Sequence, residues 1–297
     1  MREKLYCFFA SFLSLLILSC SDDNLRTHNF PNQPNDERSI LPQNITYKML
    51  KDDYDDYGYR TGNSYHYQVN TFTYRGNKIE TITCNYLIDG TNKNYRIKVI
   101  FSYDGNLITK AESYLSDRLL GTTFYSYENN RLKQQILVLS KNNTELNTKI
   151  IYSYHEDGIV AYDKFWFDGE KALTEKALLT IVNGNIIKKV LTRDTGSKII
   201  YDYKYDNEDN PFKNVLGLNL IAFGDLSIGV DPDMLHEDFG ISEFGTNNII
   251  EKKTTVKYED QIISINREIF DLEYYNHGFP KKKYINNVEL DELLFVY

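Results

Sequence analysis

An aromatic-x-Tyr pair, followed by a turn with Gly or Asn and then an aliphatic residue, recurs along this chain. The clear copies are Phe72-Thr73-Tyr74, Phe101-Ser102-Tyr103, Tyr125-Ser126-Tyr127 and Tyr152-Ser153-Tyr154. Their second tyrosines are 29, 24 and 27 residues apart, a spacing typical of repeat architectures. Because side chains alternate along a strand, both aromatics of a pair lie on one face. Gly-Asn and Asn-Asn then supply the positive φ of a tight turn, so each repeat predicts a β-hairpin.

Joined end to end, these hairpins predict an all-β fold, a large antiparallel meander. The composition agrees, because the chain has 25 Tyr and 16 Phe against one Trp, and Tyr suits a half-buried sheet surface. In one segment Ile97, Val99 and Phe101 alternate with Arg96 and Lys98. A lipid-facing strand alternates in the same way, so this pattern alone leaves open whether the sheet lies in water or forms a membrane pore.

The N-terminus has the anatomy of a secretory signal. Arg2 and Lys4 precede an apolar run over 5–18, which is shorter than the ~20 residues of a spanning helix. Ser19 and then Cys20 end the segment, and Leu16 to Cys20 resembles a bacterial lipobox. The resemblance implies cleavage before Cys20 and a lipid on its thiol, which would attach the protein to a membrane. An ordinary signal peptide with a chance cysteine is the alternative.

The sequence therefore divides into a signal peptide (1–19), a lipidated tether (20–43) and a single all-β domain (44–297). The tether contains Pro31, Pro34 and Pro42 among polar residues and has too little apolar content to fold. Asp22-Asp23 resembles the signal that sends Bacteroidetes lipoproteins to the outer face of the outer membrane. A generic polar linker with the same composition is the alternative interpretation. Since a lipid-anchored chain needs no second attachment, we expect the sheet to lie in water.

Charge and cysteine content limit which binding partners and which disulfides the chain can have. The chain has a net charge of −8, and removal of the leader makes it more acidic, which argues against a nucleic-acid partner. Once the leader with Cys7 is removed and Cys20 carries a lipid, Cys84 has no partner for an internal disulfide. In its strand-like context we expect Cys84 to be a buried apolar residue, with a reactive thiol as the alternative.

Residues 205–212 read Tyr-Asp-Asn-Glu-Asp-Asn-Pro-Phe. With the lipobox and the Tyr-x-Tyr hairpins, this motif resembles a family of uncharacterised Bacteroidetes gut lipoproteins with a porin-like fold. The resemblance covers about residue 45 to the end, and implies a rolled or barrel-like sheet without implying any activity. A looser similarity links the Tyr-x-Tyr texture to the tyrosine-aspartate repeats of Rhs-type proteins.

One segment interrupts the hairpin rhythm. Between 211 and 248 no clear copy occurs, and residues 215–224 are mostly apolar. We expect a short helix or loop here that covers an end of the sheet and protects its edges. Residues 293–297 predict a terminal strand held in the sheet.

No residue set predicts catalysis, a cofactor or a metal centre. The sequence has no phosphate-binding loop, zinc-protease motif or nucleophile elbow, and its histidines are scattered: His28, His66, His155, His236 and His277. The acidic runs 52–56 and 206–210 offer oxygen ligands for calcium, but neither matches an EF-hand loop, so turns are the favoured interpretation. The paired tyrosines could stack on sugars, but their repeat period favours a role in the core.

The sequence thus predicts a surface lipoprotein that acts as a non-catalytic binding or scaffolding module for a glycan or protein ligand. A polysaccharide hydrolase using paired carboxylates is one alternative, and a structural component of an envelope complex is another. We expect it to be anchored in the outer membrane and to face outward, with a periplasm-facing position as the alternative.

Overall fold

The computed structural model describes residues 40–54, 60–88, 94–140, 147–168, 171–221, 245–285 and 292–297. The chain divides into two compact units, Met1–Pro31 and Asn32–Tyr297, and every described residue belongs to the second. Its elements are β1 (Asn44–Tyr54), β2 (Arg60–Arg75), β3 (Lys78–Ile88), β4 (Asn94–Asp104), β5 (Leu107–Leu115), β6 (Arg118–Glu128), β7 (Arg131–Leu139), β8 (Asn147–Tyr154), a 3-10 turn (Glu156–Gly158), β9 (Ile159–Asp168), β10 (Lys171–Val182), β11 (Asn185–Arg193), β12 (Ser197–Asp209), α1 (Leu218–Ile221), β13 (Asn247–Tyr258), β14 (Gln261–Tyr274), β15 (Pro280–Ile285) and β16 (Glu292–Val296).

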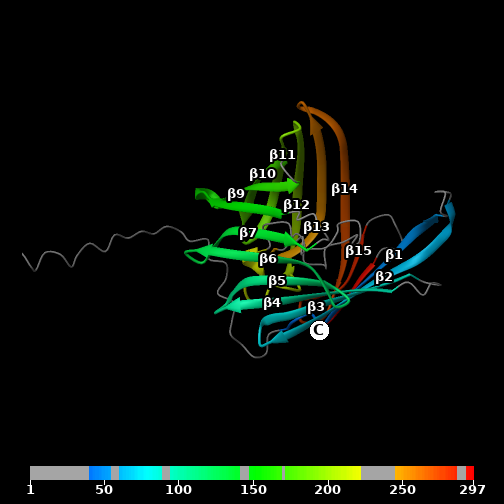
Figure 1. Ribbon diagram of the computed structural model, residues 1–297. Helices are drawn as coiled ribbons and strands as arrows, with labels where there is room; N and C mark the ends of the chain where they lie inside the picture. The colour runs from blue at the N-terminus through cyan, green and yellow to red at the C-terminus, as the bar shows by residue number, and fades with distance from the viewer. Residues whose placement is uncertain are drawn as a thin grey trace, which may run out of the picture. The chain divides into compact units, whose positions relative to one another are not determined.

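The sixteen described strands form one closed antiparallel barrel. Each strand pairs with its neighbours in sequence, as Figure 1 shows, and β16 returns to pair with β1, bringing Asn44 opposite Val296. This confirms the predicted all-β meander, and the rolled sheet is a full barrel. No helix in these ranges has the length and apolar character needed to cross a membrane.

The repeat motif builds the turns at one end of the barrel, which we call the tyrosine end. It carries the turns 76–77, 105–106, 129–130 and 183–184; the connections 116–117, 194–196 and 259–260 lie at the opposite, far end. Asn129 and Asn130 both have positive φ, as a type I′ hairpin turn requires. Gly76 and Gly105 provide positive φ at the first turn position. In these hairpins the strand register shifts next to the second aromatic of the pair, as at Ser126/Tyr127.

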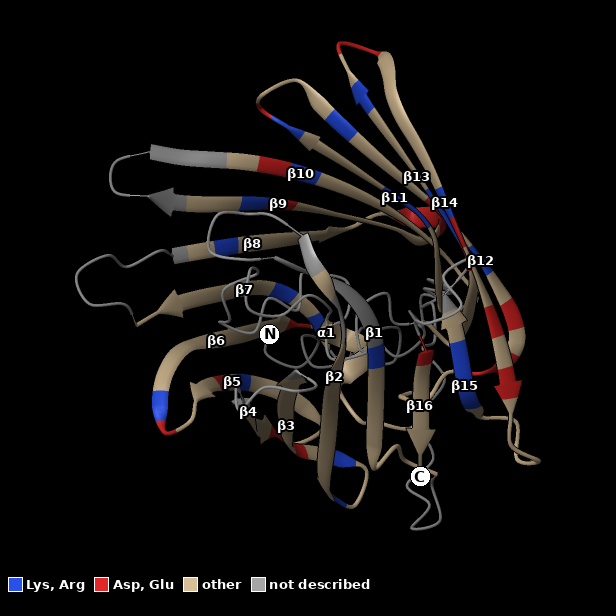
Figure 2. Ribbon diagram, turned by 90° about the vertical axis from the view of Figure 1, so that its right-hand side faces the viewer, with Lys and Arg blue, Asp and Glu red and all other residues tan. Residues whose placement is uncertain are grey.

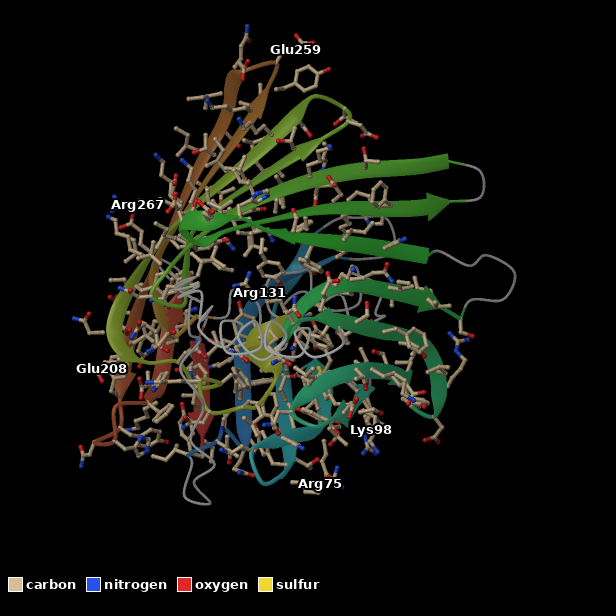
Figure 3. All side chains as sticks on the ribbon, turned by 90° about the vertical axis from the view of Figure 1, so that its left-hand side faces the viewer. Arg75, Lys98, Arg131, Glu208, Glu259 and Arg267 are labelled. Carbon is tan, nitrogen blue, oxygen red and sulfur yellow. The ribbon has the colours of Figure 1, made fainter. Side chains whose placement is uncertain are left out.

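The strand β4 is apolar on the inside and mainly polar on the outside. In β4, Ile97, Val99 and Phe101 are buried, whereas Arg96 is exposed and Lys98 lies half-buried on the other face. Figure 3 shows the Lys98 side chain directed away from the barrel interior. The core therefore sits within the ring of strands.

Residues 211–221 pack into this core. Phe212, Val215, Leu218 and Ile221 are buried, and the Phe212 ring meets the Phe72 ring edge-on with centroids 5.3 Å apart. Figures 2 and 3 show α1 within the ring of strands. The predicted helix-plus-loop is confirmed here, and so is its position over an end of the sheet, but the expected protection of sheet edges was wrong, because the described strands close into a barrel that has no edge at this end. Residues 222–244 lie outside the described ranges.

Backbone contacts fix this segment, which we call the plug (residues 211–221), against the tyrosine end. The Leu216 N–H donates to the Asn77 carbonyl at 2.9 Å, and the Tyr103 hydroxyl donates to the Leu216 carbonyl at 3.2 Å. Gly217 has a φ of +77°, and a Cβ there would stand 2.7 Å from the Asn106 carbonyl oxygen. Only glycine permits this close approach of plug and turn.

The C-terminal strand is held by pairing and by aromatic contacts, as predicted. β16 pairs with both β1 and β15. Beyond it, Tyr297 packs against Tyr275, His277 and Phe279 with centroid separations of 5.9, 5.5 and 5.6 Å. The Tyr275 hydroxyl donates to the Phe295 carbonyl at 3.1 Å. These contacts fasten the seam of the barrel at the tyrosine end.

Candidate functional site

The second tyrosines of the repeat are structural. The hydroxyls of Tyr127, Tyr154 and Tyr205 donate to backbone carbonyls on the preceding strand, those of Ile108, Leu132 and Ile186, at 2.7, 2.9 and 2.9 Å. Burial raises the pKa of Tyr154 to about 12, so its phenol stays protonated and continues to donate. The first aromatics, such as Phe72 and Tyr125, are buried. The interpretation of these pairs as core residues is confirmed.

The Asp206 carboxylate organises the motif at residues 205–212. Its oxygens accept hydrogen bonds from the backbone N–H groups of Glu208 and Asn248, both at 3.0 Å, from the Asn248 side chain, and from the Tyr274 hydroxyl. Asn210 accepts from the Phe212 N–H at 2.9 Å and so starts the plug. The favoured turn interpretation of the acidic run 206–210 was wrong for most of it: residues 206–209 form the irregular end of β12, whose register with β13 shifts between Tyr205 and Asp209. The side chains of the other run, 52–56, lie outside the described ones.

The remaining predicted candidates are dispersed. Cys20, His28 and His236 lie outside the described residues. His66 is hydrogen-bonded to the Tyr86 hydroxyl, His155 is exposed, and His277 stacks on Tyr275. Within the described ranges no three His, Cys, Asp or Glu side chains are grouped as metal ligands. Cys84 is 1% exposed, which confirms that it is a buried apolar residue.

Charged side chains do meet on the inner wall of β9, β10 and β11. Lys164 and Glu175 face each other across the β9–β10 pair, and Arg193 faces Glu175 from β11. The Arg193 Nε donates to the Glu175 carboxylate at 3.1 Å. Lys164 and Glu175 are each 4% exposed, whereas the Arg193 side chain is 48% exposed. Lys164, Glu175 and Arg193 therefore form a row of charged side chains, of which the first two are buried and the third is accessible to solvent.

Aromatic and amide groups extend this wall. The Lys164 ammonium lies 4.6 Å from the centroid of the Trp166 ring, a cation–π contact. Tyr152 meets Tyr162 edge-on at 5.7 Å, and the Tyr152 hydroxyl donates to the Gln135 side-chain oxygen at 3.2 Å. We call these seven residues the inner-wall cluster: Gln135, Tyr152, Tyr162, Lys164, Trp166, Glu175 and Arg193.

The inner-wall cluster combines fixed charges, amide and hydroxyl groups, and aromatic rings. Such a combination recognises polar ligands with apolar faces. Sequence reasoning missed it, although a signal was present: Glu175 has the same strand parity as the buried Ala177 and Leu179. A charged residue at a core-facing position of an alternating strand indicates a buried polar site, and this is the sequence signal that could have revealed the cluster.

The outer wall carries its own charges. Across β12, β13 and β14, the Glu251 carboxylate accepts hydrogen bonds from Lys204 at 2.9 Å and from Arg267 at 3.0 and 2.9 Å. These bonds lower the pKa of Glu251 to about 2. Further outward ion pairs join Lys176 to Asp163 and Lys110 to Glu112. Blue and red positions are spread along the strands in Figure 2.

These features define a closed, sixteen-stranded antiparallel β-barrel protein with a plugged interior. Among solved structures it is similar to a porin-like protein from Bacteroides uniformis, with a TM-score of 0.52 and 11% identity over 86% of this chain and 97% of that one. A porin-like protein from Bacteroides vulgatus matches at 15% identity with a TM-score of 0.41, over 87% of this chain and 99% of that one. No protein-family model matches the sequence, and no curated protein matches it.

The expectation of a porin-like fold of the kind found in Bacteroidetes is thus confirmed by the Bacteroides uniformis structure. At this identity the likeness describes the fold alone. The looser similarity to tyrosine-aspartate repeats receives no support from the comparisons.

Proposed function

We propose that this protein is a lipid-anchored outer-membrane lipoprotein whose barrel stands in water and acts as a non-catalytic binding or scaffolding module. Its lipid would be carried by Cys20, and residues 20–43 would form the tether. The acidic pair Asp22-Asp23 supports display on the outer face. The ligand would be a glycan or a protein.

The polarity of the wall carries this proposal. A membrane-spanning barrel is apolar outside and polar inside, whereas β4 buries Val99 and Phe101 inside and directs Lys98 outward. Outward charge continues around the wall at Lys110, Lys176 and Arg267. Placing one Lys or Arg on the lipid face at the midplane costs about 2–4 kcal/mol. A barrel with this outer wall is better suited to water than to a bilayer.

The inner-wall cluster supports binding in preference to hydrolysis. A glycosidase needs two carboxyl groups across its substrate cleft. The inner-wall cluster contains a single carboxylate, Glu175, and it is paired with Arg193. On the outer wall, the low pKa of Glu251 keeps it ionised. Arg193, which is half exposed, provides the access point for a polar ligand.

Cell fractionation tests the anchoring. In a Cys20→Ala variant whose residues 17–19 are replaced by Ala-Gln-Ala, so that an ordinary signal peptidase still removes the leader, we expect the protein to leave the membrane fraction and appear in the soluble fraction, because it lacks the lipid. The Cys84→Ala variant is the matched control and should remain in the membrane fraction. Retention of this leader-free variant in membranes after alkaline washing would show that the barrel itself is embedded.

Binding and turnover are separated with one panel of probes. The purified protein is mixed with soluble starch, xylan and mucin, and both retention and release of reducing ends are measured. We expect retention of at least one probe without release of reducing ends, and weaker retention in Arg193→Ala than in Lys176→Ala. Sustained release of reducing ends would support the hydrolase alternative.

A further inference from the structure

The guanidinium of Arg193 has a second hydrogen-bonding edge that its partner does not use. The Nε–H, on the side edge of the planar group, donates to the Glu175 carboxylate at 3.1 Å. Among the described residues, Arg193 makes no other hydrogen bond or ion pair. Its two Nη groups therefore form an end-on fork, which is the geometry that binds both oxygens of a carboxylate. Because the Arg193 side chain is 48% exposed, a ligand can reach this fork from solvent.

Positive charge exceeds negative charge on the inner wall of β9, β10 and β11. Lys164 and Arg193 lie on either side of the buried Glu175. Lys189 lies opposite the buried Leu179. Because residues paired directly across strands share a face, all three cations face the interior. Glu175 is the one carboxylate among the described inward side chains of these strands. A wall with this excess of cations attracts anions, although the whole chain has a net charge of −8.

The spacing of these cations favours one kind of anion. Neighbouring strands lie about 4.8 Å apart, and residues rise about 3.4 Å along a strand. The backbone of Lys164 is therefore about 10 Å from that of Arg193, and the backbone of Lys189 is about 13 Å from it. Cations spread over this distance suit a ligand with several spaced charges better than a single small anion.

An aromatic ring adds a surface for a sugar. Trp166 is partly exposed and lies on β9, two residues beyond Lys164 on the same face. The Lys164 ammonium lies 4.6 Å from the centroid of the Trp166 ring, so charge and aromatic surface occur side by side. Aromatic rings with one accessible side pack well against ligands that combine apolar faces with polar groups, as sugars do.

We propose that the inner wall of β9–β11 binds an acidic polysaccharide, built from sugars that carry a carboxylate. The Nη fork of Arg193 holds the carboxylate of one sugar, and that sugar lies beside the Trp166 ring. Lys189 attracts the carboxylate of a further sugar along the chain. This inference rests on the binding function proposed above and specifies the chemical class of its ligand.

The single tryptophan of the chain makes the site observable in solution. The purified protein is titrated with polygalacturonate while the fluorescence of Trp166 is followed. Methyl-esterified polygalacturonate, which has the same sugar backbone without the charges, is the matched probe. We expect the emission to change, with an affinity for the acid form at least about tenfold higher than for the ester. This difference should shrink in high salt, because salt screens exposed charges.

Substitutions at Arg193 separate its fork from its charge. Arg193→Gln removes both and should weaken polygalacturonate binding at least about tenfold. Arg193→Lys keeps the charge without the planar fork and should recover only part of the affinity. Lys176→Gln, on the outer face of β10 and 75% exposed, is the control and should bind as the wild type does. Circular dichroism of each variant checks that the barrel remains folded.

Three results would overturn the inference. These are equal affinities for the acid and its ester, binding that leaves the Trp166 emission unchanged, and binding that Arg193→Gln does not weaken. Retention of starch or xylan with no binding of polygalacturonate would overturn this inference alone and leave the proposed binding function standing. Failure of every glycan probe would overturn this inference together with the glycan form of the proposed function.

Discussion

The hydroxyl of Tyr127 donates a hydrogen bond of 2.7 Å to the backbone carbonyl of Ile108 on the neighbouring strand. Tyr154 and Tyr205 repeat this contact with Leu132 and Ile186. Each contact sits beside a tight turn, where the register shift opens the regular ladder. The repeated tyrosine therefore replaces a backbone interaction that the turn geometry removes.

Tyr127→Phe should destabilise the barrel by about 1–3 kcal/mol, because it leaves a buried carbonyl without its donor. Tyr258→Phe is the control, since Tyr258 is exposed, and it should change stability by less than about 0.5 kcal/mol. Urea unfolding followed by tyrosine fluorescence or circular dichroism measures both. Equal midpoints for the two variants would contradict the structural role of the tyrosine hydroxyls.

Gly217→Ala should loosen the plug. The new methyl group would lie 2.7 Å from the Asn106 carbonyl oxygen, whereas Gly76 has a similar positive φ and open space around it. A positive φ alone costs a non-glycine residue about 1–2 kcal/mol, so Gly76→Ala measures that part. We expect Gly217→Ala to lower the free energy of unfolding by more than Gly76→Ala. If Gly76→Ala proves equally damaging, the close plug contact contributes nothing.

Glu175→Ala should destabilise the protein by about 1–3 kcal/mol, because it leaves Arg193 and the buried Lys164 without a facing carboxylate. Asp163→Ala on the same strand pair removes one member of an exposed ion pair with Lys176, and exposed pairs contribute about 0–1 kcal/mol. Thermal unfolding of the two variants provides the comparison. A larger loss from Asp163→Ala than from Glu175→Ala would contradict the assignment of the inner wall.

Glu251 should make stability depend on pH below about 5. Its folded-state pKa of about 2 lies below the ordinary value of 4.5, so the unfolded state binds a proton first as the pH falls. Its stabilising contribution is therefore complete above the ordinary value and is lost as the pH falls through about 4.5 towards 2. We expect the midpoint difference between wild type and Glu251→Gln to shrink between pH 6 and pH 3 in urea titrations. A difference that stays constant or grows on acidification would refute this.

Cys84 should be chemically inert in the folded protein. Burial raises the pKa of its thiol to about 12, so at pH 8 almost none of it is the reactive thiolate. In a protein with both Cys7 and Cys20 replaced by Ala, we expect no reaction with a disulfide reagent until urea unfolds the barrel. Ser116→Cys, at an exposed turn, should react at once. Rapid labelling of Cys84 in the native state would reopen the reactive-thiol interpretation.

Much of the fold was readable from local chemistry. The period-two placement of Phe72 and Tyr74, with Gly76-Asn77 after them, specifies a hairpin and the face it buries. Closure of the sheet into a barrel could not be predicted in this way, because it depends on the pairing of Asn44 with Val296. No local sequence pattern near either residue specifies that pairing. The position of the plug over an end of the sheet was predicted, but its packing against the inner faces of the strands was not, since its apolar residues show only that they must be buried and do not show which residues bury them.

The inner-wall cluster was missed for a related reason. Glu175 and Lys164 are ordinary in composition, and only their parity with buried neighbours marks them. Their pairing with Arg193 depends on the register of three strands, which turn lengths and register shifts set together. The lipid on Cys20, by contrast, is a prediction of sequence alone.

The seam between β1 and β16 has a consequence for how the barrel is made. Every other described strand pair joins neighbours in the sequence, so its pairing requires only the closure of a local loop. The β1–β16 pair instead brings residues from opposite ends of the domain together. Loop-closure entropy makes such non-local contacts slow to form. The strand β16 is therefore the one that completes the ring of described strands, and loss of its few residues would leave an incomplete cylinder with two edges open to association.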